Sequence, residues 1–418
     1  MCTTLGKFIL TVLNWLRRSL MIKQNFVINE FGFPDDIKKL DFIGLGLRKN
    51  PKRSQLYVSE LLGKHIPQNP EKIITHAKEL AKKIMVSDST IFGAKNLQSI
   101  VIGFSETATA LSENVARELG LPYITTTRYP LEYPSFTFSE EHSHAVEQVL
   151  APSQDFLQFM KEKPLHLIFV DDEMSTGKTF INALTALLRS AELEIKSASF
   201  ASLLSTVDNE SFLHFKETKN LLKLDYLSVI ALYTQQIRLP EQFHNKARKF
   251  VDEYQDKLNV LENVDFSVIS LLNKELQFSS RGVIIHKNDD SLDKVAQKLE
   301  EVMEMKHKFE QDTLYIVGEE EFMFPPLYLA QILAEKHPMI KIKYSSTTRS
   351  PIMVMNQDNY PIKIGVSSSS TDGISRFLYN IPKEASVIFV NSSKATESQR
   401  EFTAHLLSFY KNSIGVTI

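Results

Sequence analysis

The stretch from Leu165 to Leu184 reads LHLIFVDDEMSTGKTFINAL. It opens on a mostly apolar run, which predicts a buried strand. Two carboxylates, Asp171 and Asp172, end that run, and the small polar loop STGKT follows at residues 175–179. Apolar residues then recur at helical spacing. The order strand, loop, helix predicts an α/β unit whose loop leaves the carboxyl end of a strand.

The loop is suited to a phosphate, because the start of a helix offers unpaired backbone N–H groups and the positive end of the helix dipole. Gly177 allows a ligand to approach closely, and Thr176, Lys178 and Thr179 add hydroxyl and ammonium donors. The preceding acidic pair would repel a phosphate but accept hydrogen bonds from hydroxyl groups. The expected ligand therefore carries a phosphate and a vicinal diol, as ribose 5-phosphate does.

The run VDDEMSTGKT resembles the signature of type I phosphoribosyltransferases. The resemblance implies that Asp171 and Asp172 hold the ribose 2- and 3-hydroxyls of phosphoribosyl pyrophosphate (PRPP). It implies that residues 175–179 cradle the 5-phosphate, and that Mg²⁺ arrives with PRPP, with the two aspartates as its potential protein ligands. Ser175 departs from the family pattern, since hypoxanthine-type members carry an aspartate there as a proposed general base. The resemblance therefore does not extend to a purine of that type.

A nucleotide-triphosphate P-loop is the obvious alternative, because Gly177-Lys178-Thr179 matches the end of G-x-x-x-x-G-K-[ST]. The first glycine of that motif would fall at position 172, where Asp172 stands. A carboxylate at the point where backbone must wrap a β-phosphate argues against the P-loop.

The bulk composition bounds the class of protein. A chain of 418 residues predicts two or three domains, and 43% hydrophobic with 23% charged residues is typical of an ordinary soluble protein. A net charge of -2 gives no sign of a nucleic-acid or membrane surface. The single cysteine, Cys2, favours a reducing compartment, so we expect a cytoplasmic location. Residues 1–24 are expected to be a tail, with Met21 as a second candidate start.

A basic stretch, LRKNPKRSQLYVSELLGKHIP, runs from Leu47 to Pro67. By composition alone it is a solvated loop. It also resembles the N-terminal part of the phosphoribosyltransferases encoded in tellurium-resistance (ter) gene clusters, a segment that forms a hood over the substrate in type I enzymes. The resemblance places Arg53, Lys64 and His65 near the substrate. The other cations of the stretch are Arg48, Lys49 and Lys52.

A second strand-loop-helix unit precedes the central motif. The strand at residues 99–102 runs into GFSETATA, and Gly120 ends the helix that follows. The loop resembles the pyrophosphate loop of the ter branch, which implies that Ser105, Glu106 and Thr107 bind PRPP. The alternative is an ordinary turn in which Ser105 or Thr107 is the helix N-cap.

The strand at residues 122–126 leads to Arg128 and then to a segment rich in proline and aromatic residues, which predicts a loop that closes over a site. The family has a flexible loop here with basic residues that clamp pyrophosphate. Arg128 is the expected catalytic clamp, and His142 and His144 are expected to donate hydrogen bonds near the substrate. A metal-binding H-x-H pair is the weaker alternative.

Apolar strands and amphipathic helices keep alternating to about residue 233, which predicts a mainly parallel sheet. Ligands of such sheets bind at the carboxyl ends of strands, where all three loops fall. We expect a type I phosphoribosyltransferase-like domain at residues 25–238, with helices flanking its sheet, and a helical connector at residues 239–281.

A second α/β set begins near residue 282. One strand runs into GEEEFMFPP at residues 318–326, and another into the tetrapeptide Thr348-Arg349-Ser350-Pro351. That tetrapeptide gives its name to the TRSP domain of the ter-associated enzymes, and the resemblance implies a Rossmann-like domain over residues 282–418. Arg349 and Ser350 suit a phosphate or carboxylate, and Glu320 and Glu321 suit a cation or amine. A salt-bridged arginine and a solvated acidic turn are the alternatives.

The resemblance implies a PRPP-dependent phosphoribosyltransferase that makes a nucleotide-like metabolite in ter-linked stress response and releases pyrophosphate. PRPP and an unidentified acceptor are the expected partners, without nucleic acid or membrane, and a homodimer is one expected assembly. A PRPP-binding regulator without turnover remains an alternative, because Ser175 removes the general base. A nucleotide-triphosphate hydrolase is the third.

Overall fold

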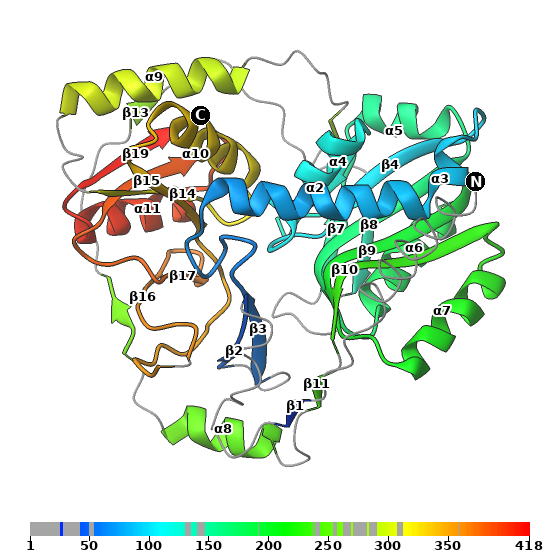
Figure 1. The fold of residues 1–418 in the computed structure, drawn as a ribbon, viewed down its shortest axis with the longest axis horizontal. Helices are drawn as coiled ribbons and strands as arrows, with labels where there is room; N and C mark the ends of the chain where they lie inside the picture. The colour runs from blue at the N-terminus through cyan, green and yellow to red at the C-terminus, as the bar shows by residue number, and fades with distance from the viewer. Residues whose placement is uncertain are drawn as a thin grey trace, which may run out of the picture.

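Two α/β halves stand side by side in the computed structural model of the chain (Figure 1). The structure describes residues 26–27, 42–49, 54–129, 135–139, 147–190, 192–235, 237–238, 243–253, 257–261, 269–270, 282–283, 291–306, 312–358 and 360–418. The expected N-terminal tail lies outside these residues.

The first half is built on a five-stranded sheet with the order β10-β9-β8-β4-β5, and every neighbouring pair is parallel. The expected parallel α/β sheet is confirmed. Residues 165–170 of β8 are all buried, because helices cover both faces of the sheet, and this explains the continuous apolar run. The strands are β4 (Gln98–Gly103), β5 (Tyr123–Thr125), β8 (Leu165–Met174), β9 (Ile195–Ser205) and β10 (Tyr226–Thr234).

Helices α2 and α4 contribute buried side chains to the core on one face of this sheet, and α5, α6 and α7 to the core on the other. The helices are α2 (Pro70–Ser87), α3 (Ser89–Phe92), α4 (Thr109–Leu119), α5 (Gln154–Lys161), α6 (Lys178–Arg189) and α7 (Asn209–Leu221). Helix α2 begins as its sequence predicts, since the Asn69 side chain accepts from the N–H groups of Glu71 and Lys72.

The strand order places a topological switch point between β4 and β8. From β4 the chain continues outward to β5 on one side, and β8, β9 and β10 then follow on the other side. In open α/β sheets, ligands bind in the crevice at the carboxyl ends of the strands on either side of such a point. The loops after β4 and β8 are the two loops that resemble PRPP-binding loops.

The second half has its own five-stranded parallel sheet, with the order β13-β19-β18-β14-β15 and a switch point between β14 and β18. Helices α9 and α10 pack on one face and α11 on the other. The elements are β13 (Ile269–Ser270), α9 (Ser291–Lys306), β14 (Thr313–Gly318), α10 (Phe324–Lys336), β15 (Lys341–Ser346), β18 (Ser386–Asn391), α11 (Glu397–Phe409) and β19 (Ser413–Thr417).

Smaller sheets surround the two large ones. A three-stranded sheet joins β12, β16 and β17, and two hairpins are formed by β2 with β3 and by β6 with β7. The bounds are β1 (Phe26–Val27), β2 (Ile43–Leu47), β3 (Gln55–Ser59), β6 (Phe136–Ser139), β7 (Glu147–Leu150), β11 (Ile237–Arg238), α8 (Phe243–Glu253), β12 (Asn259–Val260), β16 (Gly365–Ser369) and β17 (Ser375–Tyr379). Within the region expected to be a helical connector, α8 is a helix, while β12 and β13 pair with β16 and β19.

Helix α2 belongs to the cores of both halves. Near its start, Ile73 and Ile74 pack into the hydrophobic core of the second half, and further along Leu80 and Ile84 pack into that of the first. Figure 1 shows the helix running from one half to the other. One continuous helix therefore spans the two halves. None of the helices that the structure describes is both long and apolar enough to cross a bilayer.

Candidate active site

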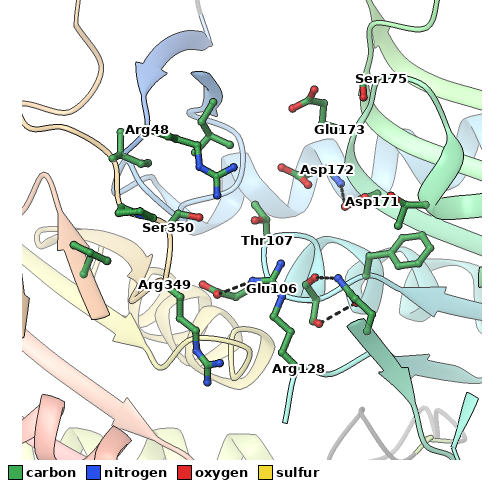
Figure 2. Close-up of a pocket in the computed structure, with 18 of the residues that line it drawn as sticks. Arg48, Glu106, Thr107, Arg128, Asp171, Asp172, Glu173, Ser175, Arg349 and Ser350 are labelled. Carbon is green, nitrogen blue, oxygen red and sulfur yellow. Dashed lines mark hydrogen bonds and ion pairs between the residues drawn. The ribbon is translucent and has the colours of Figure 1, made fainter. Parts of the chain in front are cut away.

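A cavity of about 800 Å³ is lined by residues from both halves of the chain. Figure 2 shows its two walls: Asp171, Asp172, Glu173 and Ser175 on one side, and Arg48, Arg349 and Ser350 on the other. The volume lies within the range of small-molecule sites. The cavity is at the switch point of the first sheet, because it is bordered by the loops after β4 and β8.

The end of strand β8 forms the acidic wall. Asp171 and Asp172 both line the cavity and are partly exposed to it, and the Asp172 N–H donates to the Asp171 carboxylate at 2.8 Å. Glu173 lines the cavity as well and was missed by the sequence analysis. Its signal was its position directly after the acidic pair, still inside the strand. The wall thus has three carboxylates that can accept hydrogen bonds from hydroxyl groups.

The loop after β8 brings its hydroxyl groups to the same cavity. Ser175, Thr176, Gly177 and Thr179 line it, and α6 begins at Lys178, whose side chain is exposed and not part of the lining. The Lys178 N–H donates to the Thr176 hydroxyl at 3.4 Å. The start of α6, the helix end that favours an anion, therefore borders the cavity.

Packing and backbone conformation both require a glycine at position 177. Its φ is +74°, and a Cβ there would lie 2.1 Å from the ring of Phe215. Both the left-handed backbone and the aromatic ring packed against it require glycine. Gly177 therefore lets the loop at residues 175–179 pack against Phe215.

The loop after β4 lies opposite, with Ser105, Glu106 and Thr107 in the lining. The Ser105 N–H donates to the Thr126 hydroxyl at 2.8 Å, and the Gln148 side chain donates to the Ser105 carbonyl at 2.7 Å. The Ser105–Glu106 peptide bond is cis. Interpreting this loop as a simple helix cap is wrong, since the N-cap of α4 is Ala108 and no side chain caps it.

Arg128 also lines the cavity, and its Nη1 lies 3.5 Å from a carboxylate oxygen of Glu106 (Figure 2). Burial opposes ionisation of Glu106, but the charges of Lys64 and Arg128 outweigh it and hold the pKa of Glu106 at about 2. Glu106 is therefore a carboxylate at neutral pH. It places a negative charge among the cations of this wall.

Lys64 and His65 lie behind the wall and do not line the cavity. Lys64 Nζ is 2.5 Å from Glu106 and donates to the carbonyl oxygens of Glu320 and Thr347 at 2.8 and 2.7 Å. Burial, with the charge of Lys64, lowers the pKa of His65 to about 3, so its ring is neutral at neutral pH. Arg53, His142 and His144 lie outside the described residues.

The second half contributes Arg349 and Ser350 to the lining, while Glu320 and Glu321 are not part of it. Arg349 Nε donates to Glu320 at 2.7 Å, and Glu320 is 1% exposed. Arg349 is thus both salt-bridged and part of the cavity wall. The interpretation of this segment as a solvated acidic turn is wrong, because Glu319 and Glu320 are buried.

Arg48 and Lys49 line the cavity beside the second half. Arg48 directly follows strand β2 and is held there by backbone contacts. The Met353 N–H donates to Leu47 O at 2.9 Å, and Arg48 forms a β-bridge with Ile352. The sequence showed both cations in the basic stretch but could not rank them against Lys52 and Arg53. Further lining residues that it missed are Gln148, Ser367, Gly373, Ser375 and Phe377.

The carboxylates of β8 suit a hard divalent cation. Mg²⁺ takes oxygen ligands and is commonly bound by one or two carboxylates together with substrate phosphates. Among the residues that the structure describes, no group of three His, Cys, Asp or Glu side chains is placed to hold a metal by itself. The donor set therefore fits a cation that arrives with a phosphorylated ligand.

Comparison with known proteins identifies two families along the chain. Residues 42–235 match the family described as Phosphoribosyl transferase (PRTase_2), and residues 280–407 match the TRSP domain C terminus to PRTase_2. The resemblance drawn from the sequence motifs is confirmed. A search among curated proteins gave no match.

Solved structures of adenine phosphoribosyltransferases are among the similar folds. The enzyme from Trypanosoma brucei is 14% identical with a TM-score of 0.31, and the match covers 50% of this chain and 83% of that one. The Giardia lamblia enzyme is 15% identical with a TM-score of 0.32, and the match covers 47% of this chain and 96% of that one. The Rhodothermus marinus enzyme is 14% identical with a TM-score of 0.30, and the match covers 47% of this chain and 97% of that one.

Proposed function

We propose that this chain, a member of the phosphoribosyl transferase family with a C-terminal TRSP domain, transfers the phosphoribosyl group of PRPP to an acceptor and releases pyrophosphate. One observation carries the proposal. An acidic strand end, a hydroxyl-rich helix start and a loop paired with an arginine share one cavity at a topological switch point. PRPP has a diol, a phosphate and a pyrophosphate to match them.

The 5-phosphate would bind at Ser175 to Thr179, where the first N–H groups of α6 and the hydroxyls of the loop can donate to it. The diol would donate to Asp171 and Asp172. These two contacts would hold one ribose at two positions of its ring and so orient its anomeric carbon.

The pyrophosphate would lie between the loop at residues 105–107 and Arg128, which borders the cavity beside that loop. Bound magnesium would neutralise phosphate charge, and Asp171 and Asp172 are the protein carboxylates placed to hold it. Arginine suits this position because its guanidinium stays charged and matches phosphate oxygens with two parallel hydrogen bonds.

Transfer breaks the bond between the anomeric carbon and the pyrophosphate oxygen, and the bonding electron pair leaves with pyrophosphate. A lone pair of the acceptor forms the new bond to that carbon. Positive charge develops on the ribose and negative charge on the leaving group. The β8 carboxylates stabilise the first and Arg128 the second, in the manner of preorganised electrostatic catalysis.

The acceptor would lie against the remaining wall, which Arg48, Ser350, Ser367 and Ser375 line together with Phe377. This wall combines cationic and hydroxyl groups with an aromatic ring. The pairing with a TRSP domain supports a role in ter-linked stress response, which tellurite sensitivity of a deletion strain would test.

Calorimetric titration of magnesium PRPP tests the proposal. Wild type should bind, and Asp171→Asn/Asp172→Asn should not, while Asp225→Asn, a change at an exposed aspartate outside the cavity, should bind as wild type does. Absence of wild-type binding, or unchanged binding by the double variant, would refute the assignment.

A PRPP-binding regulator without turnover is the second candidate. The observation that favours it is Ser175, which lines the cavity at the position where a general-base aspartate stands in some relatives. Pyrophosphate release with a panel of acceptors distinguishes the two, since a regulator binds PRPP and releases none.

A further inference from the structure

The second sheet has a switch point of its own, between β14 and β18, where a ligand of such a fold is usually found. The turn at residues 319–323 leaves β14 there, and the loop at residues 392–396 leaves β18. In this chain the acidic turn contacts residues 127–129 of the first half. A segment of the chain itself thus lies where a ligand is expected.

Glu321 contacts Arg128, a residue of the cavity lining. One of its carboxylate oxygens accepts the backbone N–H of Arg128 at 2.9 Å, and the other accepts the hydroxyl of Thr127 at 2.7 Å. The Thr127 hydroxyl oxygen in turn accepts the N–H of Tyr129 at 3.1 Å. A single side chain of the second half therefore fixes three consecutive residues of the first.

Tyr129 is held by three further residues of the second half. Its hydroxyl donates to Glu320 and accepts from the Gln399 side chain, the latter at 2.5 Å. The guanidinium of Arg349 lies over its ring, 4.6 Å from the centroid. Arg349 and Arg376 in turn hold the two oxygens of Glu320, at 2.7 and 2.5 Å. The residues next to Arg128 are therefore anchored in a network of charges.

We infer that Glu321 is a positioning residue for Arg128, through which the TRSP domain sets the geometry of the pyrophosphate side of the cavity. The inference rests on the proposed function, because it takes Arg128 as the pyrophosphate contact. It gives the second domain a role in the reaction: its own switch point serves to hold the first domain's arginine in place.

The physical reason is the freedom of an arginine side chain, which has several rotatable bonds and reaches its ligand reproducibly only if its Cα is fixed. Glu321 fixes the backbone at that residue, and Glu106 faces the guanidinium. The hydrogen bonds of the Glu321 carboxylate go to Thr127 and Arg128, on the pyrophosphate side of the cavity. Loss of Glu321 should therefore weaken pyrophosphate binding and spare binding of ribose 5-phosphate.

Two half-ligands separate these effects, magnesium pyrophosphate and ribose 5-phosphate, each titrated calorimetrically into the full chain. Glu321→Ala should weaken pyrophosphate binding about tenfold or more, the scale of losing hydrogen bonds to a charged group. Ribose 5-phosphate binding should stay within about twofold, less than the loss of one ordinary hydrogen bond. Glu321→Gln should restore most of the affinity, because its amide can still accept from Arg128 and donate to Thr127.

The matched control is Glu300→Ala on α9. Glu300 also accepts two donors, from Lys336 and His337, but lies outside the cavity lining. This variant should bind both half-ligands as wild type does. Thr127→Val serves as the second variant if Glu321→Ala fails to fold, and it should lower pyrophosphate affinity in the same selective way.

Equal losses for both half-ligands, or no loss for either, would overturn the inference and leave Glu321 with a structural role. Failure of the wild type to bind ribose 5-phosphate or pyrophosphate is a different result. It would remove the proposed function, and the positioning role with it.

Discussion

The Lys64 ammonium lies 2.5 Å from a carboxylate oxygen of Glu106, and the two side chains are 0% and 4% exposed. Lys64 also donates to carbonyl oxygens of Glu320 and Thr347 in the second domain. Burial lowers the pKa of the Lys64 amine, whereas the charges of Lys64, Arg128 and Arg349 lower the pKa of Glu106. We take the pair as ionised, because Nζ donates to two carbonyl groups and faces a carboxylate. One side chain thus ties the loop after β4 to the second domain.

Replacement of this lysine should destabilise the fold. Lys64→Met leaves Glu106 buried with Arg128 3.5 Å away, and breaking a buried ion pair costs about 3–5 kcal/mol. Chemical denaturation measures this loss of unfolding free energy. Lys72→Met is the control, because its 4.0 Å pair with Glu60 is about 40% exposed on both sides and should change stability by about 0.5 kcal/mol or less. Equal stability of the two variants would contradict the role of the buried pair.

Asp172→Asn should lower turnover without unfolding the protein. The side chain is partly exposed and lines the cavity. The amide keeps its size but loses the charge that we propose stabilises the developing cation. Loss of one preorganised contact of this kind raises the barrier by about 2.7–4 kcal/mol. Pyrophosphate release is measured with an acceptor found by metabolite screening, alongside a thermal melt. Near-normal turnover would refute the role of Asp172.

Gly177→Ala should impair phosphate binding. The new Cβ would meet the Phe215 ring at 2.1 Å, so the loop at residues 175–179 has to move. Gly120→Ala is the control: Gly120 has φ +65° but has no atom within 4 Å of the added Cβ. Both changes should cost about 1–2 kcal/mol for the left-handed backbone. Only Gly177→Ala should also weaken binding of ribose 5-phosphate, measured by calorimetry, and equal affinities would contradict this interpretation.

Glu319→Gln should change how stability depends on pH. Burial, followed by the charge of Glu320, raises the pKa of Glu319 to about 8 from 4.5. The folded chain therefore keeps a proton that the unfolded chain releases, and the stability from this group, complete below pH 4.5, is lost as pH rises towards 8. The loss is about 1.4 kcal/mol per pH unit across that window.

Glutamine stays neutral at every pH. The unfolding free energy of the variant should therefore rise relative to that of wild type between pH 5 and pH 8. Urea denaturation at both pH values measures the difference. Glu335→Gln, at an exposed glutamate of α10, is the comparison. A difference that stays constant with pH for Glu319→Gln would contradict the raised pKa.

Much of the candidate site was predictable because its parts are local. Asp171, Asp172 and the loop at residues 175–179 follow one another in the chain, and the parallel sheet brings the loops after β4 and β8 to one edge. Residues whose place depends on distant contacts were harder to predict. Arg48 is brought to the cavity by pairing with Ile352, a contact that four neighbouring cations in one basic stretch could not reveal.

Hydrophobic periodicity and a glycine before a helix act over a few residues, so the amino-acid sequence was enough to predict the two α/β halves and the loop at residues 175–179. The contacts that GEEEF and TRSP make became apparent from the fold. Their side chains meet residues 127–129 because α2 packs into both cores and turns the carboxyl edges of the two sheets toward each other. Such contacts join residues that are far apart in the sequence, and tertiary packing brings them close in space.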